Sequence, residues 1–162
     1  MIIFNDKVKI DRELLLEFFL TFSRFEYALK AAGYAFEVRG TVNPDWQTFR
    51  LELINIFNMS KNHELIKASN YFFDNPPNKQ VLHNGELAWK TQCPNQNESD
   101  IEFLLRMVKS VRNNLFHGGK HNNWLHEDKQ RTDTLLRNSL IILSECLKLS
   151  PQVKNRFDGA TI

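Results

Sequence analysis

Apolar residues between positions 11 and 33 recur every three or four residues, which is the spacing of one face of an α-helix. The positions on this face are Leu14, Leu15, Phe18, Phe22, Phe25, Leu29 and Ala32. Further apolar side chains fall on the other faces, namely Leu16, Phe19, Leu20 and Tyr27. A helix that is apolar over so much of its circumference is either central in the fold or shared with a second subunit.

The same periodicity predicts three or four more helices, each bounded by residues that commonly start or stop one. They run from about 44 to 58, 60 to 71, 99 or 100 to 116, and 126 to 149. Pro44 suits a first helical turn and Ser60 an N-cap, whereas Gly118-Gly119 and Pro151 are stop signals.

The stretch 73–98 has no helical period, and around Asn84-Gly85 it predicts either a small hairpin or a packed loop. After Pro151 we expect a loosely ordered tail over 152–162. The sequence therefore predicts an all-α fold, a bundle of four to five helices in a single domain spanning 1–162.

Composition narrows the classes of protein that this chain can belong to. Its 162 residues are 42% hydrophobic and 25% charged, and the formal net charge of +2 excludes a histone-like polycation. Cys93 and Cys146 form no CxxC pair, which argues against a disulfide framework or a zinc site. With no membrane-length apolar run and no export signal, we expect a cytoplasmic protein that has no membrane partner.

Residues 103–126 are the most informative segment, because they hold four Lys and Arg residues and three histidines but no Asp or Glu. Such local positive charge suits phosphate, although a solvated helix face has the same composition. At about 100° per residue, Arg112 falls inside the apolar stripe between Val108 and Leu115. A guanidinium there needs a partner, and either a structural ion pair with Glu26 or a functional site meets that need.

His117 follows five positions later, where Gly118-Gly119 release the backbone. An imidazole exchanges protons near neutral pH, and a guanidinium binds phosphate and its developing charge. Together these two groups suffice for metal-free cleavage of a phosphodiester.

The run RNNLFH, residues 112–117, resembles the R-(polar)-x-x-x-H signature of the HEPN superfamily of small helical domains, many of which are ribonucleases. The segment SRFEYALKAAG, residues 23–33, is also similar to plasmid- and phage-associated members of that superfamily. The first helix, the signature helix and the last helix follow in the order that the family has.

The resemblance implies a homodimer in which two signature motifs face one another and cut RNA without a metal or other cofactor, leaving a 2',3'-cyclic phosphate. Arg112 and His117 would be the catalytic pair and Asn113 the polar residue that orients the site. An antitoxin or a nucleotidyltransferase is a further partner that the resemblance implies, in a toxin or defence system. Lys109, Asn114 and Lys120 lie outside the signature, and charge and proximity alone predict that they contact RNA.

Two alternatives stay open at this stage. A catalytically inactive dimer that binds nucleotide, RNA or protein would use the same residues. A metal site built from His117, His121 and His126 is disfavoured, because glycines interrupt the helix and the window lacks a carboxylate or cysteine. Trp89 and Trp124 are candidates for stacking on a base, although packing is the commoner role for a tryptophan.

Overall fold

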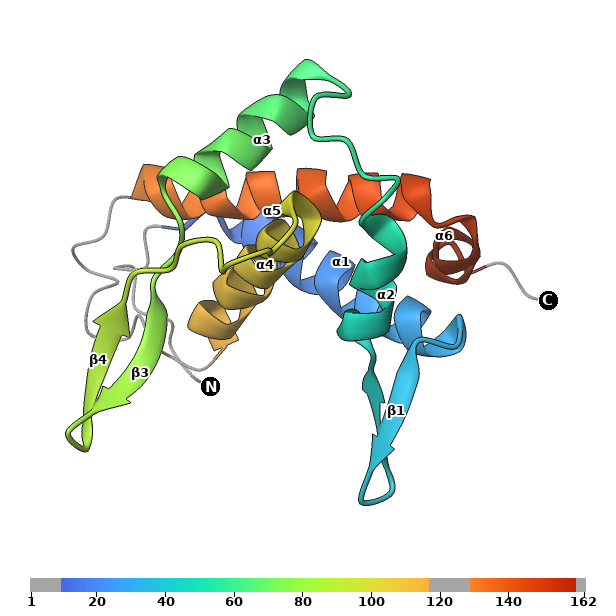
Figure 1. The fold of residues 1–162 in the computed structure, drawn as a ribbon, viewed down its shortest axis with the longest axis horizontal. Coiled ribbons are helices and arrows are strands. Elements are labelled where there is room, and N and C mark those ends of the chain that lie inside the picture. Colours follow the sequence, from blue (N-terminus) through green and yellow to red (C-terminus); the bar gives the residue numbers. More distant parts are fainter. Residues whose placement is uncertain (1–9, 117–128, 160–162) are drawn as a thin grey trace.

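The computed structural model describes residues 10–116 and 129–159, and most of this part of the chain is helical (Figure 1). The helices are α1 (Arg12–Ala31), α2 (Trp46–Leu53), α3 (His63–Asp74), α4 (Asp100–Phe116), α5 (Lys129–Leu149) and α6 (Pro151–Phe157). The strands are β1 (Ala35–Val38), β2 (Thr41–Pro44), β3 (Lys79–His83) and β4 (Glu86–Lys90). A mainly helical fold is confirmed, but two two-stranded antiparallel sheets make the all-α prediction too strict.

The long helix α5 lies in the middle of the fold and packs against α1, α3, α4 and α6. The two hairpins are separate from each other but project in the same direction, away from α3 (Figure 1). The β1–β2 hairpin lies beside α2, and the β3–β4 hairpin lies on the side of α4. Within the described ranges, no helix combines the length and the apolar character that crossing a membrane requires.

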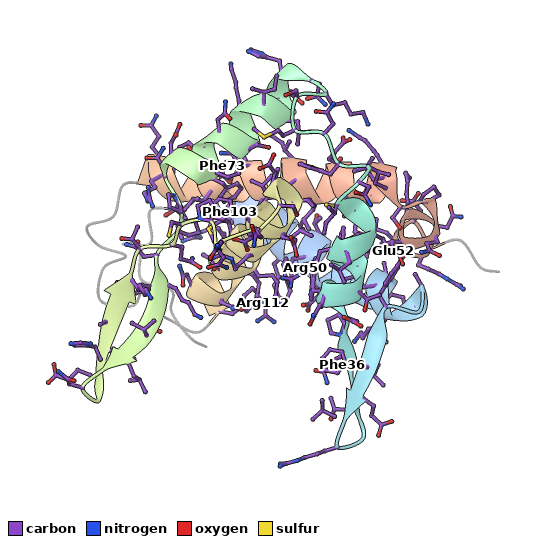
Figure 2. All side chains as sticks on the ribbon, in the orientation of Figure 1. Phe36, Arg50, Glu52, Phe73, Phe103 and Arg112 are labelled. Carbon is purple, nitrogen blue, oxygen red and sulfur yellow. The ribbon has the colours of Figure 1, made fainter. Side chains whose placement is uncertain are left out.

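Aromatic side chains fill the core between α1, α2 and α4. The indole of Trp46 stacks on Phe25, with 5.3 Å between ring centroids, and it also lies 5.6 Å from the ring of Phe22. Phe49 meets the edge of Phe25 at 5.7 Å. On the other side of α4, Phe103 stacks on Phe73 of α3 at 4.6 Å (Figure 2). The helix α4 is thus buried on two sides.

The sequence left open whether α1 is central in the fold or has an apolar face for a second subunit, and α1 combines a buried core face with an exposed apolar face. Its predicted core face is buried, with Phe18 and Phe25 fully enclosed. On the opposite side, Leu16 and Leu20 are each 56% exposed and Tyr27 is 63% exposed. This helix is therefore central in the fold and still presents an uncovered apolar strip, together with Phe19, to its surroundings.

Both hairpins turn on a pair of residues with positive φ. Asn84 and Gly85, at φ 51° and 83°, confirm the hairpin rather than the packed loop. The β1–β2 hairpin was not predicted, and it uses Arg39 and Gly40 in the same way, at φ 51° and 79°. Its second strand takes Pro44, so the prediction of Pro44 in a first helical turn is wrong, and α2 begins at Trp46 and ends at Leu53 instead of spanning 44–58.

The helix caps and the tail also differ from the prediction in detail. The N-cap of α3 is Asn62 rather than Ser60, since the Asn62 side chain accepts a hydrogen bond from the backbone N–H of Leu65 at 2.9 Å. The sequence predicts a loosely ordered tail after Pro151, but Pro151 begins the short helix α6, which extends to Phe157. The side chain of Val153 on this helix is buried in the core.

A buried tyrosine ties α6 to the rest of the fold. Gln152 donates to the hydroxyl of Tyr34, which in turn donates to Glu52 at 2.5 Å. Burial, together with the neighbouring Glu52 carboxylate, raises the pKa of Tyr34 to about 12. The hydroxyl consequently stays protonated and able to donate at neutral pH.

The aromatic core predicts that Phe49→Ala lowers the free energy of unfolding by about 3–5 kcal/mol, because a fully buried ring is lost and a cavity remains. Urea denaturation followed by circular dichroism measures this change. Leu51→Ala is the matched control on the same helix, where the side chain is 52% exposed. Equal unfolding midpoints for the two variants would contradict this description of the core.

Candidate functional site

Arg112 lies near the C-terminal end of α4, on the side where both hairpins project (Figure 2). The side chain is half-buried, and its guanidinium carbon lies 5.1 Å from the ring centroid of Phe116 and 5.7 Å from that of Phe22. Cation–π contacts of this kind hold a guanidinium by its face and leave its N–H edge for other partners.

The alternative of an ion pair between Arg112 and Glu26 is wrong for the described structure. Glu26 instead accepts a hydrogen bond from Trp46 Nε1 at 3.1 Å. Within residues 10–116 and 129–159, no carboxylate forms an ion pair with Arg112. The helical wheel placed the Arg112 guanidinium in an apolar stripe. In the structure this group lies against the rings of Phe22 and Phe116, and its side chain is only half-buried.

Asn113 contacts Arg112 directly, since its Oδ1 accepts a hydrogen bond from the Arg112 guanidinium at 3.1 Å. The polar residue of the proposed signature is therefore placed to orient the guanidinium. His117 and Lys120 lie outside the described residues, as do His121, His126 and Trp124. The predicted Arg112–His117 pair thus stays a prediction.

A cleft of about 550 Å³ runs along α4 from Glu102 to Asn113, between α2, α4 and the β3–β4 hairpin. Its lining includes five cationic side chains and one carboxylate, namely Arg50, Lys79, Lys90, Arg106, Lys109 and Glu102. Asn113 also lines it, so the cleft adjoins the residue that contacts Arg112. Of the five cations that line the cleft, only Arg106 and Lys109 come from the basic sequence window, which is why the sequence did not reveal the cleft.

Arg106 is a structural member of this group. It donates to both carboxylate oxygens of Glu98, at 2.8 and 2.6 Å, and to the backbone carbonyl of Cys93 at 2.9 Å. A fourth hydrogen bond, at 3.2 Å, reaches the side-chain oxygen of Gln92. Hydrogen bonding from Arg106 lowers the pKa of Glu98. These contacts fasten the segment after β4 to α4 and form one wall of the cleft.

The base of the β3–β4 hairpin is fixed to α4 by two amide side chains. Asn114 Nδ2 donates to the carbonyl of Asn78 at 2.8 Å. Gln92 Nε2 donates to the carbonyl of Pro77 at 2.6 Å and to Ser110 Oγ at 3.0 Å. Asn114, which charge and proximity suggested as an RNA contact, is thus engaged in holding the hairpin.

Lys109 lies at the edge between the cleft and Arg112. Its ammonium group is 5.8 Å from the ring centroid of Trp46. Burial lowers the pKa of Lys109, Glu26 opposes that shift, and the charges of Arg50 and Arg112 add to it. Burial is the largest cause of this shift, and the two nearby cations act in the same direction.

The strand register brings two more lysines together at the base of the hairpin. Lys79 and Lys90 are direct cross-strand partners, and both line the cleft. Within the described part of the chain, neither forms an ion pair with a carboxylate. Trp89 belongs to the other face of β4, opposite Gln80, so it does not line this cleft.

Among the described residues, no group of three or more His, Cys, Asp or Glu side chains is arranged to hold a metal ion. The exposed thiol of Cys93 lines the cleft, whereas Cys146 is buried in the core.

Comparison with protein-family models gives no match, and comparisons with curated proteins and with solved structures give none either. The HEPN resemblance therefore rests on the signature residues, and the assignment of the chain to that superfamily stays a prediction.

The Glu98–Arg106 contact predicts a specific dependence of stability on pH. Because the folded-state pKa of Glu98 lies below its ordinary value of 4.5, its contribution is complete above that value and is lost as the pH falls through the folded-state pKa. The difference in unfolding midpoint between wild type and Glu98→Gln should be largest at pH 7 and shrink below pH 4.5.

Thermal unfolding followed by circular dichroism from pH 7 to pH 3 measures this difference. Glu86→Gln, at the exposed tip of the β3–β4 hairpin, is the control and should lower the midpoint little at any pH. A Glu98→Gln effect that is constant over the whole range would disprove the role given to this carboxylate.

Proposed function

We propose that this protein is a metal-independent endoribonuclease of the HEPN type. The observation that carries the proposal is the state of Arg112, whose guanidinium lies on aromatic rings, contacts Asn113, and pairs with no carboxylate among the described residues. A structural arginine such as Arg106 has its charge matched by a carboxylate. An arginine without such a partner, beside a basic cleft, suits a phosphate ligand.

In this proposal Arg112 binds the scissile phosphate and stabilises the charge that develops on it. The 2'-oxygen of the RNA attacks phosphorus, the bond to the 5'-oxygen of the next nucleotide breaks, and a 2',3'-cyclic phosphate forms. His117 transfers a proton, either from the attacking hydroxyl or to the leaving oxygen. Asn113 orients Arg112, and Lys109 and Lys120 contact flanking phosphates of the RNA.

A homodimer is the second part of the proposal, and the uncovered strip of α1 supports it. Leu16, Phe19, Leu20 and Tyr27 form an apolar face that a second copy would cover. This strip is continuous with the end of α4, because the rings of Phe19 and Phe116 lie 5.1 Å apart. Pairing through α1 would therefore bring two Arg112 side chains to one interface.

The catalytic assignment predicts that Arg112→Ala and His117→Ala each lower the rate of RNA cleavage at least 100-fold while the fold is retained. Purified variants are incubated in EDTA with single-stranded and structured RNA, and the product ends are analysed for 2',3'-cyclic phosphate. Arg137→Ala, which removes an exposed arginine of α5, should cleave like wild type.

If wild type at high concentration leaves the RNA as intact as the two variants do, the ribonuclease proposal fails. Retained RNA or nucleotide binding in the same samples would then favour the inactive binding module. An antitoxin or nucleotidyltransferase partner is tested separately, by loss of cleavage when the candidate partner is added.

The dimer proposal predicts that Leu16→Glu/Leu20→Glu yields a folded monomer that has lost cleavage, since two carboxylates would be buried in the interface. Light scattering coupled to size exclusion gives the mass, and circular dichroism checks the fold. Leu51→Glu places a carboxylate at an equally exposed leucine of α2 and should leave the mass of wild type unchanged. A dimeric double variant would show that the strip is not the interface.

A further inference from the structure

We propose that the cleft between α2, α4 and the β3–β4 hairpin binds a second backbone phosphate of single-stranded RNA, beside the one held by Arg112. The identity of the RNA as substrate rests on the proposed function, whereas the phosphate site itself is argued from the cleft. The residues assigned to it are Arg50, Lys79 and Lys90, none of which belongs to the signature.

The charges of the cleft are not balanced within the protein. Arg106 is matched by Glu98, and Arg50 has only a loose partner, with its Nε 3.5 Å from Glu102. That Nε is buried and has no hydrogen-bond partner in the described structure. This atom has almost no accessible surface, so a ligand in the cleft would reach the exposed part of the Arg50 side chain, which is 33% accessible overall. A phosphate oxygen would accept hydrogen bonds there.

The strand register gives an independent reason. Like charges placed directly opposite each other in an antiparallel pair destabilise the hairpin, yet Lys79 and Lys90 occupy one such position. A phosphate between or above them converts this repulsion into attraction. At the tip of the same face His83 faces Glu86, so among the pairs on this face the two lysines stand opposite each other only where the hairpin borders the cleft.

The size and the surroundings of the cleft favour a single strand. Its volume of about 550 Å³ lies within the ~300–1,000 Å³ of pockets that enclose a small molecule, which suits one nucleotide. Double-stranded RNA is instead recognised across successive grooves over about 16 base pairs. Asn113, Ser110 and Lys79 also line an adjoining pocket of about 270 Å³, so polar groups continue from the cleft along α4.

The test uses the full chain carrying His117→Ala, so that binding is measured without cleavage. The probe is a fluorescent 12-nucleotide 2'-O-methyl RNA, titrated by anisotropy at several salt concentrations. Lys79→Gln/Lys90→Gln should weaken its binding roughly tenfold and reduce the salt slope by about 0.7 for each lysine. Lys30→Gln/Lys67→Gln removes the same charge away from the cleft and should change the affinity far less.

A second readout locates the ligand. Cys93 lines the cleft and is exposed, whereas Cys146 is buried, so iodoacetamide should modify Cys93 alone among the two cysteines of the native protein. The oligonucleotide should slow this modification, and the effect should be lost in Lys79→Gln/Lys90→Gln. Adenosine monophosphate at the same concentration should protect much less, because it makes only one phosphate contact.

The inference is overturned if the two double variants bind alike, if Cys93 is not protected, or if the mononucleotide protects as well as the strand. These outcomes are distinct from failure of the ribonuclease proposal. A protein that never cleaves RNA but binds it with the expected dependence on Lys79 and Lys90 retains the phosphate site and loses only the catalytic assignment.

Discussion

The position of the cleft depends on one guanidinium, that of Arg106. Its four hydrogen bonds hold the carboxylate of Glu98, the backbone at Cys93 and the side chain of Gln92 against α4. Gln92 in turn holds the start of the hairpin through Pro77. A two-stranded sheet has little stability of its own. The β3–β4 hairpin therefore depends on these hydrogen bonds to hold it against the helical core.

Two arginines six residues apart on α4 have opposite relations to their surroundings. Arg106 uses four of its five N–H groups on protein acceptors, and a ligand would have to compete with them. Arg112 is held by the faces of Phe22 and Phe116, which fix its position without neutralising its charge. Arg112 therefore keeps more of its hydrogen-bonding capacity for a ligand than Arg106 does, because less of it is used within the described structure.

Local patterns predicted most of the helices, and long-range geometry accounts for what they missed. The 3.6-residue period located α1, α4 and α5, and Asn84-Gly85 is a strong hairpin signal. At the other hairpin the first turn residue is Arg39, which rarely adopts positive φ, so the turn was not recognised. The cleft combines Arg50 with the two lysines of the second hairpin, residues whose proximity no sequence period encodes.

The like-charge pair Lys79 and Lys90 makes the stability of the β3–β4 hairpin depend on salt. Exposed ion pairs weaken as mobile ions accumulate, because the Debye length falls to about 8 Å in a physiological electrolyte. Salt screens the repulsion between Lys79 and Lys90 in the same way. Raising the ionic strength should therefore stabilise this hairpin, whereas it weakens attractive ion pairs on the surface. The same counterions would compete for the two ammonium groups with the RNA phosphate proposed above.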